Sequence, residues 1–268
     1  MSREEVEDFD SMDYITDAHA VIVWEPPEAL LIDDFYIPRK ENITIAGIID
    51  TRIWPSQGGF PHQIFEPKDI ALLASLTACL NDVCINGCAV LLFSKLNNLA
   101  IPVHCALLSS HDLPHIRYNA PDVILWRNVS WTSYWEKDIW ILPIHRPSNI
   151  GHWVLCVVRF SSKELHLFDS LAEKKPWKHD VKDIMKLIAR FLAIAHQQHH
   201  DVPTDLDGWT AKPLNVMPIQ SNAYDCGVWV LAVIIAILRG CHVTAVHEHD
   251  MDHLRHYLRA LILSIPSN

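Results

Sequence analysis

The sequence predicts an α+β domain, and three observations support this fold class. Strand-like runs are grouped in the middle of the chain, between residues 138 and 168. Segments whose apolar residues recur at helical spacing lie before and after them. Half of the 268 residues are apolar, so a sizeable core can be buried. Strands grouped between helices are typical of a sheet that helices cover.

The first residues differ from the rest of the chain in charge. Of the first seventeen, seven are acidic and only Arg3 is basic. We therefore expect residues 1–18 to form a solvated, flexible leader, followed by a single domain over residues 19–268. Short strand-like runs at 20–24 and 43–49 are interrupted by prolines.

Two helical segments precede the central strands. Residues 68–80 and 82–96 both carry apolar residues at helical spacing. Asn81 or Asp82 can cap the second helix, because a short polar side chain accepts hydrogen bonds from the free N–H groups of the first turn. Residues 99–128 are mixed in pattern and are punctuated by prolines.

The central strands are the clearest elements of the sequence. Residues 138–144, 152–160 and 164–168 are apolar runs of strand length. A short polar stretch at 161–163 separates the last two runs, so we expect them to pair as an antiparallel hairpin. In such a hairpin the start of one strand lies beside the end of the other.

Helices dominate the second half of the chain. We expect an amphipathic helix at 178–199, a loop at 201–213, a short extended piece at 214–219, a buried helix at 226–238 and a last helix at 250–263.

Composition excludes some classes of protein. The formal net charge of −10 argues against a nucleic-acid binder, which normally carries a basic stripe. The apolar run at 228–238 is too short to span a bilayer, which needs about 20 residues. Seven cysteines without a disulfide rhythm, and no signal-peptide pattern at the start, indicate a reducing intracellular compartment, nucleus or cytoplasm. We expect a monomer with neither nucleic acid nor membrane as a partner.

Cys226 is the first candidate for chemistry, because it directly precedes a strongly helical apolar run. The positive end of a helix macrodipole favours the thiolate, the reactive form of cysteine. Gly227 leaves room beside the sulfur for another segment of backbone. The plainer interpretation is a small buried apolar residue.

Three further residues suit a cysteine nucleophile. His152 begins a strand, where an imidazole can exchange protons and is still held rigidly. Asp169 ends the partner strand of the hairpin, so its carboxylate can accept the Nδ1–H of His152 and orient the ring. The amide of Gln220, six residues before Cys226, can donate to an oxyanion together with the backbone N–H of Cys226. Each residue taken alone also fits an ordinary surface or loop position.

These residues resemble the ubiquitin-like-protein proteases, the SUMO/sentrin-specific cysteine proteases that share a fold with adenovirus proteinase. The resemblance is strongest over residues 68–262, and its blocks are Leu80-Asn-Asp82, the Pro-Ile step within 138–144, His152-Trp153, Phe168-Asp-Ser-Leu171 and Gln220-Ser-Asn-Ala-Tyr-Asp-Cys-Gly227.

The resemblance implies a papain-like, adenain-like fold with a central mixed or antiparallel sheet flanked by helices. It implies a catalytic triad of His152, Asp169 and Cys226, with Gln220 lining the oxyanion hole. It also implies that Trp153 and Asp82 bind substrate, Trp153 as a wall of a narrow tunnel for a Gly-Gly tail. The reaction is then hydrolysis of a peptide or isopeptide bond at the end of a ubiquitin-like modifier (SUMO, NEDD8 or ubiquitin, with a SUMO type favoured). No cofactor is needed.

The sequence departs from this family at one place. The tryptophan that opens the family's first block has no counterpart here, because Cys79 precedes Leu80. A tunnel wall formed by that tryptophan would be altered.

Other interpretations stay open at this stage. An acyltransferase of the same fold would use the same three residues, and a catalytically weak relative could simply bind a ubiquitin-like protein. Metal binding is a further alternative, since His249 and His253 are four residues apart next to other acidic and histidine residues. We expect no metal there, because no third ligand has a recognisable spacing.

Overall fold

The computed structural model describes residues 20–22, 49–50, 64–96, 104–241 and 244–265. The expected leader and most of the strand-like run at 43–49 lie outside these residues. The strands are β1 (Ala20–Ile22), β2 (Ile49–Asp50), β3 (Ile64–Phe65), β4 (Cys105–Leu107), β5 (Ile139–Arg146), β6 (His152–Arg159), β7 (Glu164–Phe168) and β8 (Trp209–Pro213). The helices are α1 (Pro67–Ala74), α2 (Asp82–Leu96), α3 (Asp112–Arg117), α4 (Asp122–Val129), α5 (Trp177–His199), α6 (Cys226–Leu238) and α7 (Met251–Leu263).

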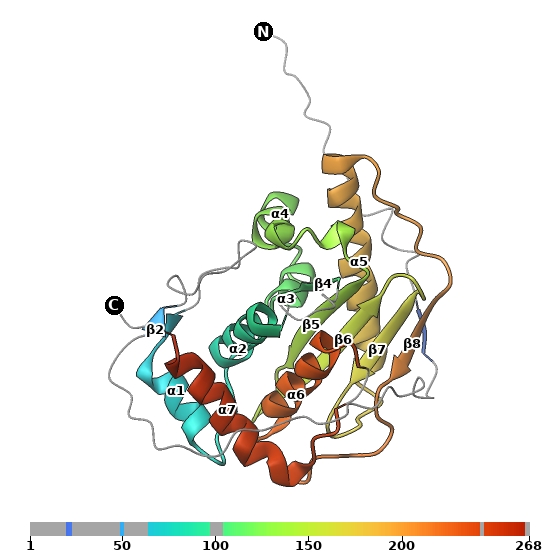
Figure 1. Ribbon diagram of the computed structural model, residues 1–268. Coiled ribbons are helices and arrows are strands. Elements are labelled where there is room, and N and C mark those ends of the chain that lie inside the picture. The colour runs from blue at the N-terminus through green and yellow to red at the C-terminus, as the bar shows by residue number, and fades with distance from the viewer. Residues whose placement is uncertain (1–19, 23–48, 51–63, 97–103, 242–243, 266–268) are drawn as a thin grey trace.

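A mixed sheet forms the centre of the molecule (Figure 1). Its strands follow the order β1-β8-β7-β6-β5-β4. The three middle strands β5, β6 and β7 pair antiparallel, whereas β4 and β8 add to them in parallel. The prediction of an α+β fold with a mixed, helix-flanked sheet is therefore confirmed.

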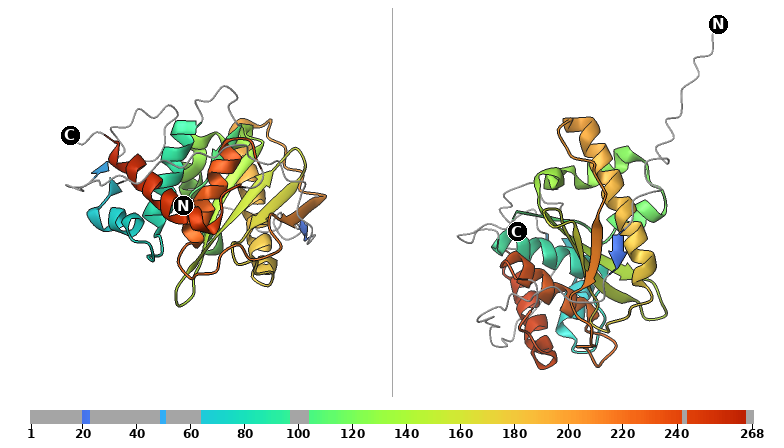
Figure 2. Two further views of the ribbon diagram at one scale, coloured as in Figure 1. Left: turned by 60° about the horizontal axis from the view of Figure 1, so that its bottom comes forward. Right: turned by 90° about the vertical axis from the view of Figure 1, so that its right-hand side faces the viewer.

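Both faces of this sheet are covered, as Figure 2 shows. Alternate residues of β6 point to opposite faces. Trp153, Leu155 and Val157 pack in a core with α2, α6 and α7. Val154 and Cys156 pack in a second core, with α5. Burial on both faces explains why this strand reads as an unbroken apolar run instead of an alternating one.

The observed elements differ from the sequence prediction at two places. The first helix ends at Ala74, six residues early, because carbonyls of the following segment accept side-chain hydrogen bonds from distant residues. The segment predicted as a loop contains β8 (Trp209–Pro213), whose residues are alternately buried and half-buried. Residues 214–219, predicted as extended, follow that strand without joining it.

Two other expectations hold. Asn81 caps α2, since its Oδ1 accepts a hydrogen bond of 2.9 Å from the N–H of Cys84. The hairpin of β6 and β7 has the expected antiparallel pairing, with Leu155 opposite Phe168. No helix in the described part of the chain has the length and apolar character that a bilayer-spanning segment requires.

Arg255 of α7 ties together segments that are far apart in sequence. Its side chain is 1% exposed, and its guanidinium donates to the Asp225 carboxylate at 2.7 and 3.0 Å. It also donates to the carbonyls of Leu72, Ser75, Ala78 and Tyr224. The irregular segment after α1 and the turn before α6 are thereby fixed to each other.

The first prediction concerns Arg255→Met. This change leaves the buried Asp225 carboxylate and several carbonyls without their donor, so we expect the free energy of unfolding to fall by about 3–5 kcal/mol. Urea denaturation measures the loss. The control Lys163→Met removes an exposed ion pair with Asp205 and should change stability by less than about 1 kcal/mol. Equal effects of the two changes would contradict this account.

Candidate active site

The start of β6, the end of β7 and the start of α6 meet at one end of the central strands of the sheet. His152 is the first residue of β6, and Asp169 directly follows β7. The hairpin register brings the two residues together, with His152 Nε2 2.8 Å from Asp169 Oδ1. The contact between the two residues is as expected, but the ring is turned: Nε2 and not Nδ1 faces the carboxylate, which leaves Nδ1 available to Cys226.

The start of β6 is set by Gly151. Its φ of +76° lies in the region that favours glycine, and a Cβ there would lie 2.5 Å from Nε2 of His145. Another residue at this position would therefore displace the histidine on the neighbouring strand or the turn that leads into His152.

His152 is held largely in its protonated form. Burial lowers the pKa of its imidazole, but hydrogen bonds with Asp169 and Cys226 outweigh burial and raise it to about 9. Burial likewise raises the pKa of the Asp169 carboxyl, but the hydrogen bond with His152 and the nearby Arg146 cation outweigh this and keep it below its ordinary value. The two side chains therefore form a hydrogen-bonded ion pair at neutral pH.

Cys226 is the first residue of α6, as the sequence predicts, and it is 2% exposed. Its hydrogen bond with His152 contributes to the raised pKa of the imidazole. Gly227 lets other segments approach: a Cβ there would lie 3.0–3.3 Å from Ile85, Leu80 and Trp153. Cys226, His152 and Asp169 thus come from α6, β6 and the end of β7 and lie together, with 2.8 Å between His152 Nε2 and Asp169 Oδ1 and with Cys226 near enough to His152 to raise the pKa of its imidazole.

Gln220 is buried and held at both ends of its amide. Its Oε1 accepts a hydrogen bond of 2.7 Å from the Ser170 hydroxyl, and its Nε2 donates to the carbonyl of Asn222 at 2.7 Å. Gln220 and His152 line the same surface groove, together with Leu171 and Ala223. Sequence reasoning missed Ser170, although it directly follows Asp169.

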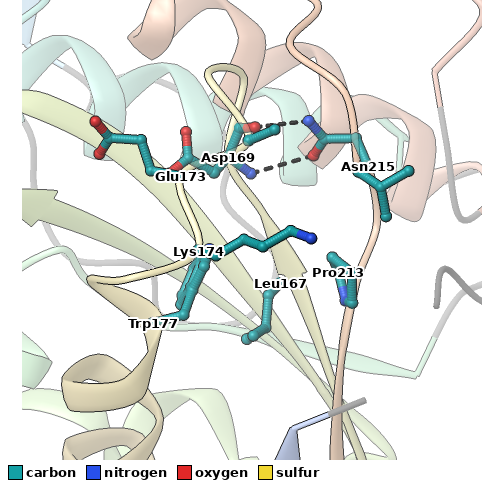
Figure 3. Close-up of a pocket in the computed structure, with 9 residues that line it drawn as sticks. Leu167, Asp169, Glu173, Lys174, Trp177, Pro213 and Asn215 are labelled. Atoms are coloured by element: carbon teal, nitrogen blue, oxygen red, sulfur yellow. Dashed lines mark hydrogen bonds between the residues drawn. The ribbon is translucent and has the colours of Figure 1, made fainter. Parts of the chain in front are cut away.

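Asp169 has further partners that the sequence did not reveal. Asn215 binds its backbone on both sides, with Nδ2 2.6 Å from the Asp169 carbonyl and Oδ1 3.3 Å from its N–H (Figure 3). The N–H of Leu171 donates to Oδ1 at 2.9 Å, and Arg146 donates to Oδ2 at 2.5 Å. Both Arg146 and Asn215 are remote from Asp169 in sequence, so no local motif predicts these contacts.

The two predicted substrate-binding residues lie on the same side of the sheet as Cys226. Trp153 is 4% exposed, and its Nε1 donates to the Leu80 carbonyl at 2.7 Å. Asp82 opens α2 and pairs with His111 at 3.3 Å. The burial of Trp153 fits strand-core packing, and its role as a tunnel wall stays a prediction, as does substrate binding by Asp82.

His249, considered above as a metal ligand, and a group of aromatic residues pack against neighbouring side chains. No group of three or more metal-ligating side chains occurs among the described residues. His249 stacks on His247. Trp126, Tyr134 and Trp135 pack their rings on one another.

The chain is similar in sequence to a known family of proteases. Residues 113–267 match the C-terminal catalytic domain of the Ulp1 protease family. The chain is 26% identical over 133 residues to ubiquitin-like-specific protease 1A of Arabidopsis thaliana, and the match covers 49% of this chain and 25% of that protein. It is 30% identical over 104 residues to mouse sentrin-specific protease 5, covering 38% of this chain and 13% of that protein. The chain thus spans about a quarter or less of these relatives.

Solved structures share the fold. The catalytic domain of the Ulp1-like SUMO protease from Chaetomium thermophilum superposes with a TM-score of 0.59 and 21% identity, covering 75% of this chain and 79% of that one. The yeast Ulp1 protease domain in complex with Smt3, the yeast ortholog of SUMO, gives a TM-score of 0.53 and 19% identity, covering 75% and 83%.

The second prediction concerns the titration of His152. Its imidazole should titrate near pH 9 in the folded protein, as followed by NMR, and Asp169→Asn should lower that pKa. Because the pKa is raised above the ordinary value of about 6.5, the pair stabilises the folded state fully below that value. Its contribution is lost as the pH rises from about 6.5 through 9.

Urea denaturation tests the same sign. The stability difference between the unaltered protein and Asp169→Asn should shrink over that pH interval. A His152 that titrates near 6.5 in the unaltered protein would contradict the prediction.

Proposed function

The chain belongs to the Ulp1 protease family, and from this premise we propose that it is a cysteine protease with Cys226 as nucleophile, His152 as base and Asp169 as the group that orients the base. The proposed substrate is a ubiquitin-like modifier of SUMO type, cleaved at the peptide or isopeptide bond that follows its C-terminal Gly-Gly. The observation that carries the proposal is the meeting of Cys226, His152 and Asp169, in which His152 Nε2 lies 2.8 Å from Asp169 Oδ1 and Cys226 lies beside His152.

The first step forms the nucleophile. In the proposed resting state His152, whose pKa is about 9, already holds the proton that it has taken from the Cys226 thiol, and Asp169 stabilises this imidazolium at 2.8 Å. The start of α6 adds the positive end of its macrodipole beside the sulfur. The thiolate then attacks the carbonyl carbon of the terminal glycine.

The second step needs donors for the oxyanion. The backbone N–H of Cys226 and the amide of Gln220 are the proposed donors. Ser170 and Asn222 fix the amide of Gln220, so it does not have to reorganise as charge develops. His152 next protonates the leaving amine, and water hydrolyses the thioester in the second half of the reaction.

The substrate class rests on the relatives. The curated relatives are named for ubiquitin-like and sentrin-specific proteolysis. Leu80 and Trp153 are buried beside Gly227, and the resemblance gives Trp153 as a wall of the tunnel. A flat aromatic wall excludes side chains, so this role of Trp153 favours a chain end made of glycine.

Cys79 lies where the proposed tunnel for the Gly-Gly tail differs from the family pattern. Cys79 occupies the position where the resemblance expects tryptophan. Its thiol lies 3.7 Å from the carbonyl of Ala223, and Ala223 is three residues before the proposed nucleophile. The smaller side chain leaves that wall less complete, so we expect weaker selectivity for Gly-Gly with the chemistry unchanged.

The third prediction tests the nucleophile and the substrate together. Ubiquitin, SUMO and NEDD8 that carry a C-terminal electrophile should label the protein at Cys226, with SUMO fastest. Cys226→Ala should abolish labelling and hydrolysis while leaving binding of the modifier intact. Cys241→Ala, which changes a cysteine that is more exposed than Cys226, should label normally.

Two outcomes would favour the other readings. Transfer of a radiolabelled acyl group from acyl-CoA to a protein, without hydrolysis of any modifier, indicates an acyltransferase. Tight modifier binding without labelling at Cys226 indicates a binding module.

The fourth prediction concerns the oxyanion donor. Gln220→Leu removes the amide, so kcat should fall about 100- to 1000-fold while KM changes little. Asn222→Ala leaves the backbone carbonyl that accepts from Gln220 Nε2 in place and should have a smaller effect. Steady-state hydrolysis of a fluorogenic modifier substrate measures both. Unchanged kcat in Gln220→Leu would remove Gln220 from the mechanism.

A further inference from the structure

We propose that Arg146 is a positioning residue of this active site: by bridging Asp169 and Asp180 it fixes the orienting carboxylate and tunes the charge that His152 and Cys226 experience. The inference rests on the proposed function, because it assigns a further residue to the same reaction. Arg146 is the last residue of β5, and it belongs to none of the motifs that the sequence offers.

The geometry around Asp169 carries the proposal. The two carboxylate oxygens of Asp169 have different partners. Oδ1 faces His152 at 2.8 Å, and Oδ2 accepts a hydrogen bond of 2.5 Å from Nη1 of Arg146. Both Arg146 and Asp169 are almost fully buried, with side chains 11% and 2% exposed. The carboxylate is thus clamped between the imidazole and the guanidinium, so its plane is fixed by both.

The guanidinium is itself held by α5. Its Nε donates to Oδ2 of Asp180 at 2.8 Å, and its plane lies over the Trp177 ring at 4.4 Å. Asp180 in turn accepts from Arg117 of α3 at 2.6 Å. Arg146 therefore cannot swing away from Asp169 without breaking a second buried ion pair and an aromatic stack.

Charge is the second consequence of this clamp. Arg146 is a cation one hydrogen bond from Asp169 and two from His152, so it offsets part of the negative charge that stabilises the imidazolium. The same cation acts through Coulomb interaction on the Cys226 sulfur and on the Asp169 carboxylate, and it helps to keep the pKa of that carboxyl below its ordinary value. Asp180 carries the opposite charge at the far side of Arg146, and it weakens each of these effects.

Other charged and titratable groups face the site from neighbouring elements. Burial lowers the pKa of the His145 imidazole on β5, and the neighbouring His152 lowers it further. Asp225 precedes the nucleophile and is neutralised by Arg255 of α7. Cys79, in the segment before α2, is coupled electrostatically to Cys226. Among the described residues, none of these groups forms a hydrogen bond with Asp169. Substitutions at Arg146 and Asp180 therefore test the contacts of the Asp169 carboxylate without changing these other groups.

Opposite changes of charge make the test directional. The pH profile of kcat/KM has an acidic limb set by formation of the thiolate and an alkaline limb set by loss of the imidazolium proton. Arg146→Met removes a cation, so both limbs should move to higher pH by about 0.5–1 unit. Asp180→Asn removes an anion, so both limbs should move to lower pH.

A conservative variant separates charge from position. Arg146→Lys keeps the cation, so the limbs should stay near those of the unaltered enzyme. A single ammonium cannot reproduce the fork that spans two carboxylates, so kcat should still fall about tenfold or more. The control Arg190→Met removes another buried arginine, 12% exposed and paired with Asp122, and should leave both limbs in place.

The measurements are pH profiles of hydrolysis and of Cys226 alkylation by iodoacetamide, with circular dichroism to verify that each variant is folded. Limbs that move in opposite directions in Arg146→Met and Asp180→Asn, together with reduced kcat in Arg146→Lys, support the proposal. If Arg146→Met does not fold, Asp180→Asn and Arg146→Lys decide the question on the same criteria. Limbs that stay fixed or move in the same direction, or full activity of Arg146→Lys, overturn it.

Failure of this inference is distinct from failure of the proposed function. If Cys226→Ala retains hydrolysis, the proposed mechanism is wrong and the Arg146 measurements no longer bear on it. If Cys226 is essential and the limbs of the pH profile do not move in Arg146→Met or Asp180→Asn, the protease assignment stands and only the positioning role of Arg146 is lost.

Discussion

The pairing of β6 with β7 is the constraint on which the rest of the site depends. It determines that a residue at the start of one strand and a residue just beyond the end of the other lie 2.8 Å apart, as His152 and Asp169 do. A shift of one residue in this register would turn His152 toward the opposite face of the sheet. Burial of β6 on both faces opposes any such shift, because every residue of Trp153–Val158 would exchange one core for the other.

The position of Cys226, the proposed nucleophile, depends on a different set of contacts. Cys226 stands on α6, and its position relative to the sheet is determined by packing against β6 and by the turn that precedes the helix. Arg255 holds that turn through Asp225 and Tyr224. The acid–base pair thus belongs to the sheet, and the thiol belongs to the helical layer. The site forms where the two layers meet.

Local patterns were enough to predict the main elements and to single out Cys226, His152 and Asp169, which the structure brings close together. The apolar runs of β6 and β7, separated by a short polar turn, placed Asp169 beside His152, and a cysteine at the start of an apolar helix was evident from the sequence. The supporting residues were not. Arg146, Asn215 and Arg255 act across 23, 46 and 30 residues of sequence, and nothing in their neighbours distinguishes them from surface residues. The early end of α1 has the same origin, because its following carbonyls bind Arg255.

The tie made by Arg255 also bears on how the enzyme comes into being during translation. Every other element that contributes to the site precedes α7 in the chain, so a ribosome has synthesised His152, Asp169 and Cys226 before the guanidinium that fixes the nucleophile's turn exists. A nascent chain that stops short of this helix carries all the reacting groups without a fixed arrangement of them. In such a chain the turn before α6 lacks the contacts that Arg255 makes with Asp225 and Tyr224.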